Sequence, residues 1–184
     1  MNDHKGFFAM MARMKYIERW ALMRNSVSEN ICEHSLEVAM LAHGLGIIGR
    51  KRFGKDLSPE RLAMLGMYHD CTEIITGDMP TPVKYANDEL KEAYKAIEDS
   101  AAQRLLEMLP EDLRAEYESY FLPEQITPEE YRYVKAADKL SALIKCIEEE
   151  KTGNQEFRSA KQATYESLQQ MNMPEVTVFC EAFL

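Results

Sequence analysis

The chain has 184 residues, of which 46% are hydrophobic and 29% are charged, a composition typical of a globular protein with a real core. Its 31 acidic and 22 basic residues give a net charge of −9. That charge argues against binding to nucleic-acid polymers or to anionic membranes, both of which need basic surface. A small anionic substrate stays compatible, because one arginine or one metal ion creates a local positive site. We expect one domain over residues 1–184.

The cysteines and the apolar stretches indicate the compartment. Cys32, Cys71, Cys146 and Cys180 show no CxxC spacing, and in a chain of this size reduced thiols are expected rather than a disulfide framework. The N-terminal residues lack the layout of a signal peptide, and the longest apolar stretch, 39–48, is too short to span a bilayer. The sequence therefore predicts a cytoplasmic protein without a membrane partner.

Helical patterns recur along the chain, whereas strand signals are weak. Apolar residues repeat at three- and four-residue steps, and Ser58-Pro59 and Thr127-Pro128 each place a capping residue before a proline at the first helical position. We expect an all-α fold of roughly seven or eight helices. The expected helices cover residues 7–21, 33–50, 59 to about 73, 88–108, a shorter one to about 120, 128–151, 155–171 and 175–183.

Two segments interrupt the helical pattern. Residues 23–30 are polar and lack periodicity, and residues 76–85 contain Pro80 and Pro82, which remove backbone donors and restrict their neighbours. Irregular segments on a helical scaffold are where binding groups tend to lie.

Polar residues share the apolar faces of three predicted helices. His34 precedes Val38 and Leu41 by four and seven residues, and His69 follows Leu65 by four, so both imidazoles are expected to face the core. A single inward histidine is more often a hydrogen-bonded core residue than a metal ligand.

Two carboxylates strengthen the metal interpretation. Asp138 follows Val134 by four residues beside an apolar stripe, and Asp70 adjoins His69. Two imidazoles and two carboxylates that converge in a helical core satisfy one another most readily through a divalent cation. Such nitrogen and oxygen ligands suit several transition metals, and the sequence does not choose among them.

The residues that carry this pattern resemble a known family. The order His34, His69-Asp70, Asp138 is the H…HD…D signature of HD-domain metal-dependent phosphohydrolases, although the HD dyad alone is a weak motif. The flanking stretches are much more specific, and the resemblance to the bacterial HD-domain 5′-deoxynucleotidases runs from about residue 7 to 157. Those stretches are RWALMRN (19–25), ENICEHSLEVAMLAH (29–43), GMYHD (66–70), EIITGDMPTPVKY (73–85) and VKAADKL (134–140).

The resemblance implies an activity and a metal site. Enzymes of this family remove phosphate from deoxyribonucleoside 5′-monophosphates. The implied ligands are His34, His69, Asp70 and Asp138, which would hold one divalent transition metal cation, namely Co, Mn, Zn, Fe, Ni or Cu.

The resemblance also assigns catalytic and substrate-binding residues. Glu73 and Arg19 are expected to be catalytic, with Glu73 as a base or water-orienting group one turn beyond the dyad and Arg19 on the phosphate. Without the resemblance, Glu73 reads equally well as a solvated helix end, Trp20 as a core residue, and Asp78 as a turn residue. The expected substrate-binding residues are Arg19, Trp20, His34, His69, Asp78, Met79, Pro80, Thr81 and Asp138.

Other functions stay open at this stage. An HD phosphodiesterase or a nucleoside polyphosphate hydrolase is the nearest alternative, and those larger substrates usually need more basic residues than flank these ligands. A non-catalytic nucleotide-binding HD module, or a helical interaction protein with core histidines, is a further alternative. The apolar residues of the tail, 168–184, could cover the core or a second subunit, and we expect a homodimer.

Overall fold

The computed structural model describes residues 6–84 and 86–184. Over these residues the chain is helical and contains no strand, only one isolated antiparallel bridge between Glu18 and Asn30. Seven of the described helices have ten or more residues, which confirms the predicted all-α fold. They are α2 (Ile31–Phe53), α3 (Pro59–Tyr68), α6 (Asp88–Leu106), α7 (Glu111–Phe121), α8 (Pro128–Lys151), α9 (Arg158–Gln170) and α10 (Pro174–Phe183).

Shorter helical pieces complete the described chain. The α-helical ones are α1 (Phe7–Met11), α4 (Glu73–Thr76) and α5 (Thr81–Lys84). The 3₁₀ turns are Ala12–Tyr16, Pro123–Gln125 and Gln155–Phe157.

The chain divides into two compact units. Unit 1 comprises Met1–Leu22, Ser28–Glu33 and Tyr68–Ile126, and unit 2 comprises Met23–Val27, His34–Met67 and Thr127–Leu184. The single domain expected from the sequence stays a prediction.

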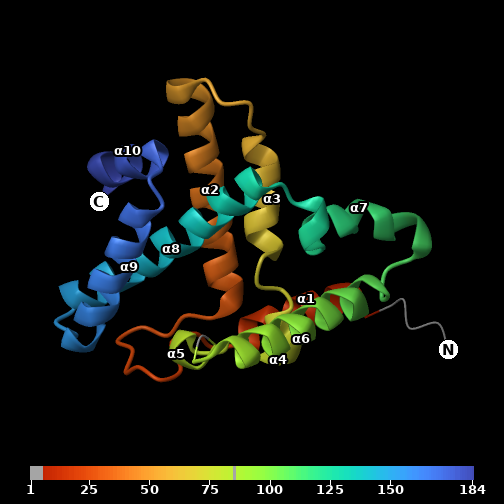
Figure 1. Ribbon diagram of the computed structural model, residues 1–184. Coiled ribbons are helices and arrows are strands. Elements are labelled where there is room, and N and C mark those ends of the chain that lie inside the picture. The colour runs from red at the N-terminus through yellow and green to blue at the C-terminus, as the bar shows by residue number, and fades with distance from the viewer. Residues whose placement is uncertain (1–5, 85) are drawn as a thin grey trace. The chain divides into compact units, whose positions relative to one another are not determined.

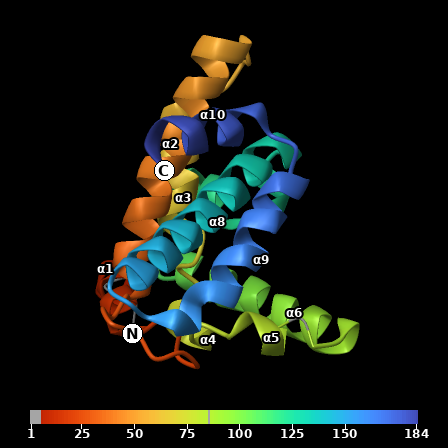
Figure 2. The ribbon, with the colours of Figure 1, turned by 90° about the vertical axis from the view of Figure 1, so that its left-hand side faces the viewer.

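The core of unit 2 forms where α2, α3, α8, α9 and α10 contribute apolar side chains. Leu45 and Leu140 are fully buried in it, together with Leu62 from α3 and the aromatic ring of Tyr133. Figures 1 and 2 both show α9 running beside α8. Gly66 of α3 lies so close to the α2 backbone that an added Cβ would come within 3.0 Å of the Ala39 Cα atom.

The core of unit 1 forms around α6. Leu105 and Leu106 are buried there with Phe7 and Phe121, and the rings of Phe7 and Tyr117 meet edge to face with their centroids 5.1 Å apart. Figure 1 shows α1 alongside α6, and α4 and α5 also contact α6. Unit 1 thus packs its short N-terminal and middle helices against one long helix.

Capping residues fix where the longer helices begin. Thr127 accepts a hydrogen bond from the Glu130 backbone N–H, and the Glu130 side chain accepts one in return from the Thr127 N–H, a capping box that confirms the predicted start of α8. The Ser58 hydroxyl accepts from the Arg61 N–H at the start of α3, as expected. Asn30 accepts from the N–H groups of residues 32 and 33, so α2 begins at residue 31, two residues earlier than predicted.

The helix predicted over residues 7–21 is wrong beyond residue 16. Ile17 is extended, and its carbonyl accepts a hydrogen bond from the Ile31 N–H, while the Arg19 N–H donates to the Glu29 carbonyl at 2.8 Å. Backbone pairing with residues 29–31 therefore replaces the helical hydrogen bonds that the apolar spacing favoured.

Helix α2 contains the apolar stretch 39–48 within its 23 residues. By length and composition it could cross a membrane, with a mean hydropathy of 1.2 over its most apolar window, although the stretch considered alone is too short. Half of that window is buried inside the protein, and the core helices of soluble proteins pass the same test. Length and composition are therefore weak evidence for a span.

Candidate functional site

Unit 2 brings two of the predicted metal ligands together. His34 lies in the first turn of α2 and is fully buried, and Asp138 lies in the middle of α8 with its side chain 25% exposed. The His34 Nε2 atom is 3.3 Å from Asp138 Oδ1. The predicted inward face of α2 is confirmed, because Val38 and Leu45 are buried on it together with His34.

A hydroxyl and a carboxylate determine which nitrogen of His34 carries the proton. The Ser141 Oγ atom is 3.0 Å from His34 Nδ1 and donates its own proton to Glu37 Oε2 at 2.5 Å. A hydroxyl that gives its proton to a carboxylate must accept from the imidazole, so Nδ1 is the protonated nitrogen. In the neutral tautomer with the proton on Nδ1, Nε2, which faces the Asp138 carboxylate, is available to bind a divalent metal.

Unit 1 holds the other predicted pair in a turn. Helix α3 ends at Tyr68, and the Cys71 N–H donates to the Tyr68 carbonyl, so His69 and Asp70 follow the helix instead of extending it. The expectation that they lie in the same helix as Glu73 is wrong, since Glu73 opens the separate helix α4. Within the turn, His69 Nε2 lies 3.0 Å from Asp70 Oδ2, and both side chains are largely buried.

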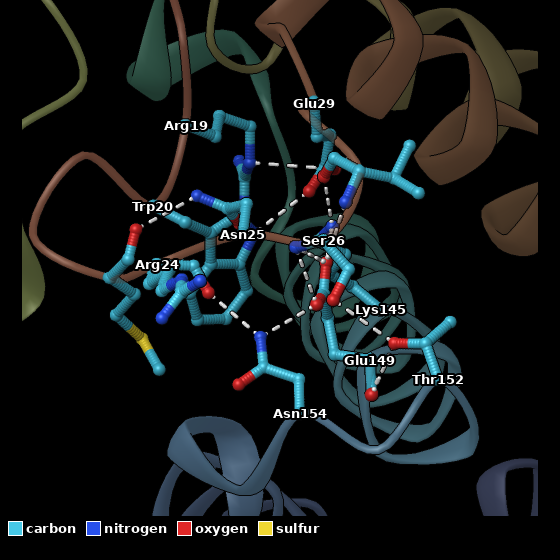
Figure 3. A network of polar contacts seen from close by, with 12 residues as sticks. Arg19, Trp20, Arg24, Asn25, Ser26, Glu29, Lys145, Glu149, Thr152 and Asn154 are labelled. Atoms are coloured by element: carbon cyan, nitrogen blue, oxygen red, sulfur yellow. Dashed lines mark hydrogen bonds and ion pairs between the residues drawn. The ribbon is translucent and has the colours of Figure 1, made fainter.

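Arg19 and Trp20 lie in the extended segment after residue 16. Arg19 Nη1 is 3.4 Å from Asp70 Oδ2, and its Nε is 3.6 Å from Glu29 Oε1. The Trp20 indole N–H donates to Glu29 Oε2 at 2.7 Å, so one carboxylate contacts both side chains. Figure 3 shows Glu29 beside Arg19 and Trp20.

The backbone of Trp20 adopts an unusual conformation. Its φ is +60°, in the left-handed region that residues other than glycine rarely adopt. Holding a tryptophan there costs on the order of 1–3 kcal/mol, and such residues cluster at functional sites.

Glu73 is a buried carboxyl group of unit 1 whose pKa is strongly raised. Its side chain is buried, and its Oε2 atom has no hydrogen-bond partner among the described residues. Burial, and then the negative charges of Asp70 and Asp78, raise the pKa of Glu73 to about 9, although Arg19 and Lys84 act in the opposite direction. Strongly raised pKa values of buried carboxyls are typical of functional sites.

Asp78 follows α4 at the start of an irregular segment, as the prolines predicted. Residues 77–80 are not helical, but residues 81–84 form the single helical turn α5, where the sequence predicted no regular helix. Here Pro82 is tolerated because a first helical turn needs no donor from it. Asp78, Met79 and Pro80 are half-buried, whereas Thr81 is exposed.

Sequence reasoning missed the residues that support these groups. Ser141 lies three residues after Asp138, and Glu37 three residues after His34, so each is one helical turn from a proposed ligand. That spacing can be read from the sequence, but only the structure shows that Ser141 contacts both Glu37 and His34. Glu29 was missed because nothing in its spacing links it to Arg19.

The predicted residues are thus grouped by unit. His34 and Asp138 belong to unit 2, and unit 1 contains all the others. The unit 1 residues are Arg19, Trp20, His69, Asp70, Glu73, Asp78, Met79, Pro80 and Thr81.

The comparisons with known proteins agree with each other. The family model described as 5′-deoxynucleotidase YfbR-like matches residues 6–184. A 5′-deoxynucleotidase of Vibrio atlanticus is 49% identical over 177 residues, which cover 96% of this chain and 91% of the relative. The 5′-deoxynucleotidase YfbR of Shigella boydii is 46% identical over 178 residues, covering 97% and 89%.

Solved structures show the same fold. An HD-domain phosphohydrolase from Listeria innocua superposes with a TM-score of 0.84 at 22% identity, covering 97% of this chain and 86% of that one. The HD phosphohydrolase of cyanophage S-2L, solved with dA and one catalytic Zn²⁺ ion, gives a TM-score of 0.62 at 23% identity, covering 91% and 88%. With an HD-type fold, a match over residues 6–184 and relatives that are 46–49% identical along most of their length, this chain belongs to the 5′-deoxynucleotidase YfbR-like family.

Proposed function

We propose that this chain is a metal-dependent 5′-deoxynucleotidase, which hydrolyses deoxyribonucleoside 5′-monophosphates to deoxyribonucleosides and inorganic phosphate. The observation that carries the proposal is the family match over residues 6–184, with curated relatives named for this activity. The cyanophage neighbour, an HD phosphohydrolase bound to dA and a catalytic Zn²⁺ ion, supports it as a protein of related fold.

The proposed cofactor is one divalent transition metal, held by His34, His69, Asp70 and Asp138. Imidazole nitrogens and carboxylate oxygens are the ligands that such metals share, and Co, Mn, Zn, Fe, Ni or Cu would all fit this donor set. The proton on Nδ1 of His34 supports the assignment, because it leaves Nε2 ready to bind. When bound, the metal lowers the pKa of a water molecule and neutralises charge on the phosphate.

Glu73 would then act on the attacking water. In the chain without metal its carboxyl group is held protonated near neutral pH, because burial and two neighbouring carboxylates raise its pKa to about 9. Added positive charge near Asp70 favours the ionised carboxylate, which can accept a proton from water. Arg19 offers a planar fork of donors for the phosphate oxygens.

The sugar and the base would meet the remaining residues. Asp78 would accept a hydrogen bond from the sugar 3′-hydroxyl, while Met79, Pro80 and Thr81 form a stiff segment that crowds the 2′ position. Trp20 offers a flat ring that accepts any base. Asp78 would also repel a 3′-phosphate by charge.

A substrate panel tests the activity. Phosphate release should be fastest with dAMP, slower with AMP, and slowest with deoxyadenosine 3′-monophosphate and dATP. Each substrate is measured with several divalent metals. Equal kcat/KM for dAMP and AMP would contradict the sugar selection. Release from polyphosphates or diesters alone would favour the alternative HD phosphohydrolases, and binding without release would favour a non-catalytic nucleotide-binding module.

Elemental analysis tests the ligand set. The wild-type chain should contain one transition metal per chain, and Asp138→Ala should contain much less. Asp99→Ala, which changes an exposed carboxylate on α6, is the matched control and should keep its metal. Equal metal content in all three proteins would overturn the ligand assignment.

We also propose that the enzyme is a cytoplasmic homodimer. The homodimer is supported by Phe183 and Leu184 at the C-terminal end of the chain, which expose 68% and 53% of their surface, because exposed apolar side chains favour association. Light scattering at several concentrations, and fractionation of the producing cells, test the two statements separately.

A further inference from the structure

The segment that carries Asp78 is held at both of its ends by one face of α6. Tyr94 and Glu98 are four residues apart on that helix, so their side chains lie on the same face. Tyr94 contacts Thr76 and Gly77 at the start of the segment. Glu98 contacts Lys84 at its end. We call residues 77–84 the gate segment.

At the start of the gate segment, three polar groups meet. The Tyr94 hydroxyl oxygen is 3.0 Å from Thr76 Oγ1 and 3.1 Å from the Gly77 carbonyl oxygen. The Thr76 hydroxyl donates to the same carbonyl at 3.0 Å. The Tyr94 side chain is buried, with 3% of its surface exposed, so its hydroxyl is directed into the protein and not toward solvent.

At the end of the gate segment, α5 is tied to the same helix. The Lys84 Nζ atom is 2.8 Å from Glu98 Oε1, and it lies over the Tyr94 ring, 4.6 Å from the ring centroid. The ring of Tyr94 therefore supports the second tether, while its hydroxyl makes the first.

The Gly77 carbonyl matters because it belongs to the same planar peptide as the Asp78 nitrogen. Gly77 has φ +75° and ψ 160°, a conformation open essentially to glycine, and nothing lies within 4 Å of where its Cβ would be. Gly77 has no side chain to anchor this peptide by packing, so hydrogen bonds to its carbonyl contribute to its orientation. The Gly77 N–H donates to the Glu73 carbonyl at 2.8 Å and so holds only the preceding peptide, whereas Thr76 and Tyr94 donate to the Gly77 carbonyl and hold this one.

We propose that Tyr94 is a positioning residue for sugar selection: its hydroxyl fixes the peptide between Gly77 and Asp78, and so fixes how closely residues 79–81 approach the sugar 2′ position while Asp78 meets the 3′-hydroxyl. This inference rests on the proposed function, because it needs Asp78 to contact the sugar. The contacts of Tyr94 given above are to Thr76, the Gly77 carbonyl and Lys84, and Glu73 acts on it only as a nearby charge. Its effect should therefore fall on substrate discrimination, not on the metal site.

The alternative is that the buried Tyr94 hydroxyl makes these hydrogen bonds only because a buried polar group needs a partner. A buried tyrosine usually finds a partner, and loss of that partner would lower stability alone. The two roles differ in the ratio of kcat/KM for dAMP to that for AMP, which a purely structural role does not change.

The first test is Tyr94→Phe, which removes the hydroxyl but keeps the ring under Lys84. The dAMP-to-AMP ratio should fall about five- to tenfold, mostly through a higher kcat/KM for AMP, because a peptide that has lost an orienting hydrogen bond lets residues 79–81 move away from the 2′-hydroxyl. Metal content should stay equal to that of the wild type. Tyr131→Phe, at an exposed tyrosine of α8, is the matched control and should leave the ratio unchanged.

The second test is a double-mutant cycle with Thr76→Val, which removes the other hydroxyl that donates to the Gly77 carbonyl. Each single variant should lower the ratio, and the double variant should lower it by less than the product of the two effects, because both act on one peptide. Independent effects that multiply would contradict a shared action through Gly77.

The outcomes separate this inference from the proposed function. If the wild-type chain releases no phosphate from dAMP, the proposed function fails. If the wild type selects dAMP and Tyr94→Phe keeps the same ratio while folded and metal-loaded, the positioning role is overturned and the proposed function stands. A variant that loses metal and turnover in equal proportion would show a structural role for Tyr94 and would also overturn the inference.

Discussion

Glu73 combines burial with a position among charges of both signs. Two carboxylates, Asp70 and Asp78, raise its pKa, and two cations, Arg19 and Lys84, lower it. The group is therefore sensitive to any charge added near it, which is what a base that must be ionised only in the loaded enzyme requires.

Glu73→Gln should lower kcat by about 10²–10⁴, the usual scale for a positioned acid or base, while metal content and fold are kept. Gln keeps the shape of the side chain but cannot take a proton from water. Steady-state phosphate release from the metal-loaded variant checks this, with Glu92→Gln on the exposed face of α6 as the control. Turnover close to that of the wild type would show that Glu73 is not the base.

Ser141 contacts a proposed metal ligand and not the proposed reaction centre. Because its hydroxyl accepts from His34 Nδ1 and donates to Glu37, Ser141→Ala should free the imidazole to turn and to change its protonated nitrogen. Metal affinity should fall about 10- to 100-fold, as for other residues that orient a ligand. Titration with a metal indicator measures it, and Ser159→Ala, at an exposed serine of α9, should bind as the wild type does. An unchanged Kd would contradict the orienting role.

At the scale of elements, α8 anchors the polar segment 23–27 through one buried glutamate. Glu149 Oε2 accepts from the Ser26 N–H at 2.8 Å and from the Asn154 side-chain amide at 2.8 Å, and Lys145 contacts its other oxygen. Figure 3 shows Ser26, Lys145 and Asn154 around this carboxylate. Segment 23–27 was predicted to be irregular, and Glu149 supplies the acceptors that its backbone lacks.

This carboxylate makes stability depend on pH. Burial alone would raise the pKa of Glu149, but the donors from Lys145, Asn154 and Ser26 outweigh it and hold the pKa well below its usual range. A lowered folded-state pKa means that the stabilisation is fully present above about pH 4.3, the unfolded value, and is lost as the pH falls toward the folded value.

Glu149→Gln should therefore cost about 2–3 kcal/mol in the free energy of unfolding at pH 7, and less at pH 3.5, where the wild type itself has lost part of the contribution. Urea unfolding at both pH values measures the gap. Glu148→Gln, at the exposed neighbour, should show almost no loss at pH 7. If the wild type and Glu149→Gln differ by the same free energy of unfolding at both pH values, the pH dependence does not come from the Glu149 carboxylate.

Element boundaries show where the sequence was informative and where it was not. The start of α8 is encoded locally by Thr127 and Glu130, and it could be predicted. The end of the first helix could not, because residues 17–19 leave the helical pattern to pair with residues 29–31, a contact that local spacing does not contain. His69 follows the apolar residues of α3 at helical spacing, so the periodicity predicted that it belongs to this helix. The helix ends at Tyr68, one residue earlier.

At the scale of the whole molecule, the chain divides into two units, and each contains two of the proposed metal ligands. His34 and Asp138 belong to unit 2, and His69 and Asp70 to unit 1. The family signature linked these four residues across the sequence, whereas composition and charge gave only a globular acidic chain. The contacts of the supporting residues Ser141, Glu37 and Glu29 could not be predicted from the sequence, because their partners lie up to 107 residues away.

Removal of the metal should lower thermal stability. A ligand that binds only the folded chain stabilises it by about 2.7 kcal/mol at a free concentration 100 times its Kd, which for a chain of this size corresponds to a Tm shift of about 5–10 °C. Calorimetry before and after chelation, with the metal then added back, measures the shift. An equal Tm in both states would contradict a metal bound to the folded protein.

Trp20 is the only tryptophan of the chain, and its indole N–H is fixed on Glu29 beside Arg19. The protein therefore contains one strong intrinsic fluorophore, and it lies in the loop where the nucleotide is proposed to bind. Excitation at the long-wavelength edge of the indole band, where the nine tyrosines absorb very little, selects emission from that loop. The chain thus carries its own optical reporter, which can follow nucleotide titrations and stopped-flow binding without a label.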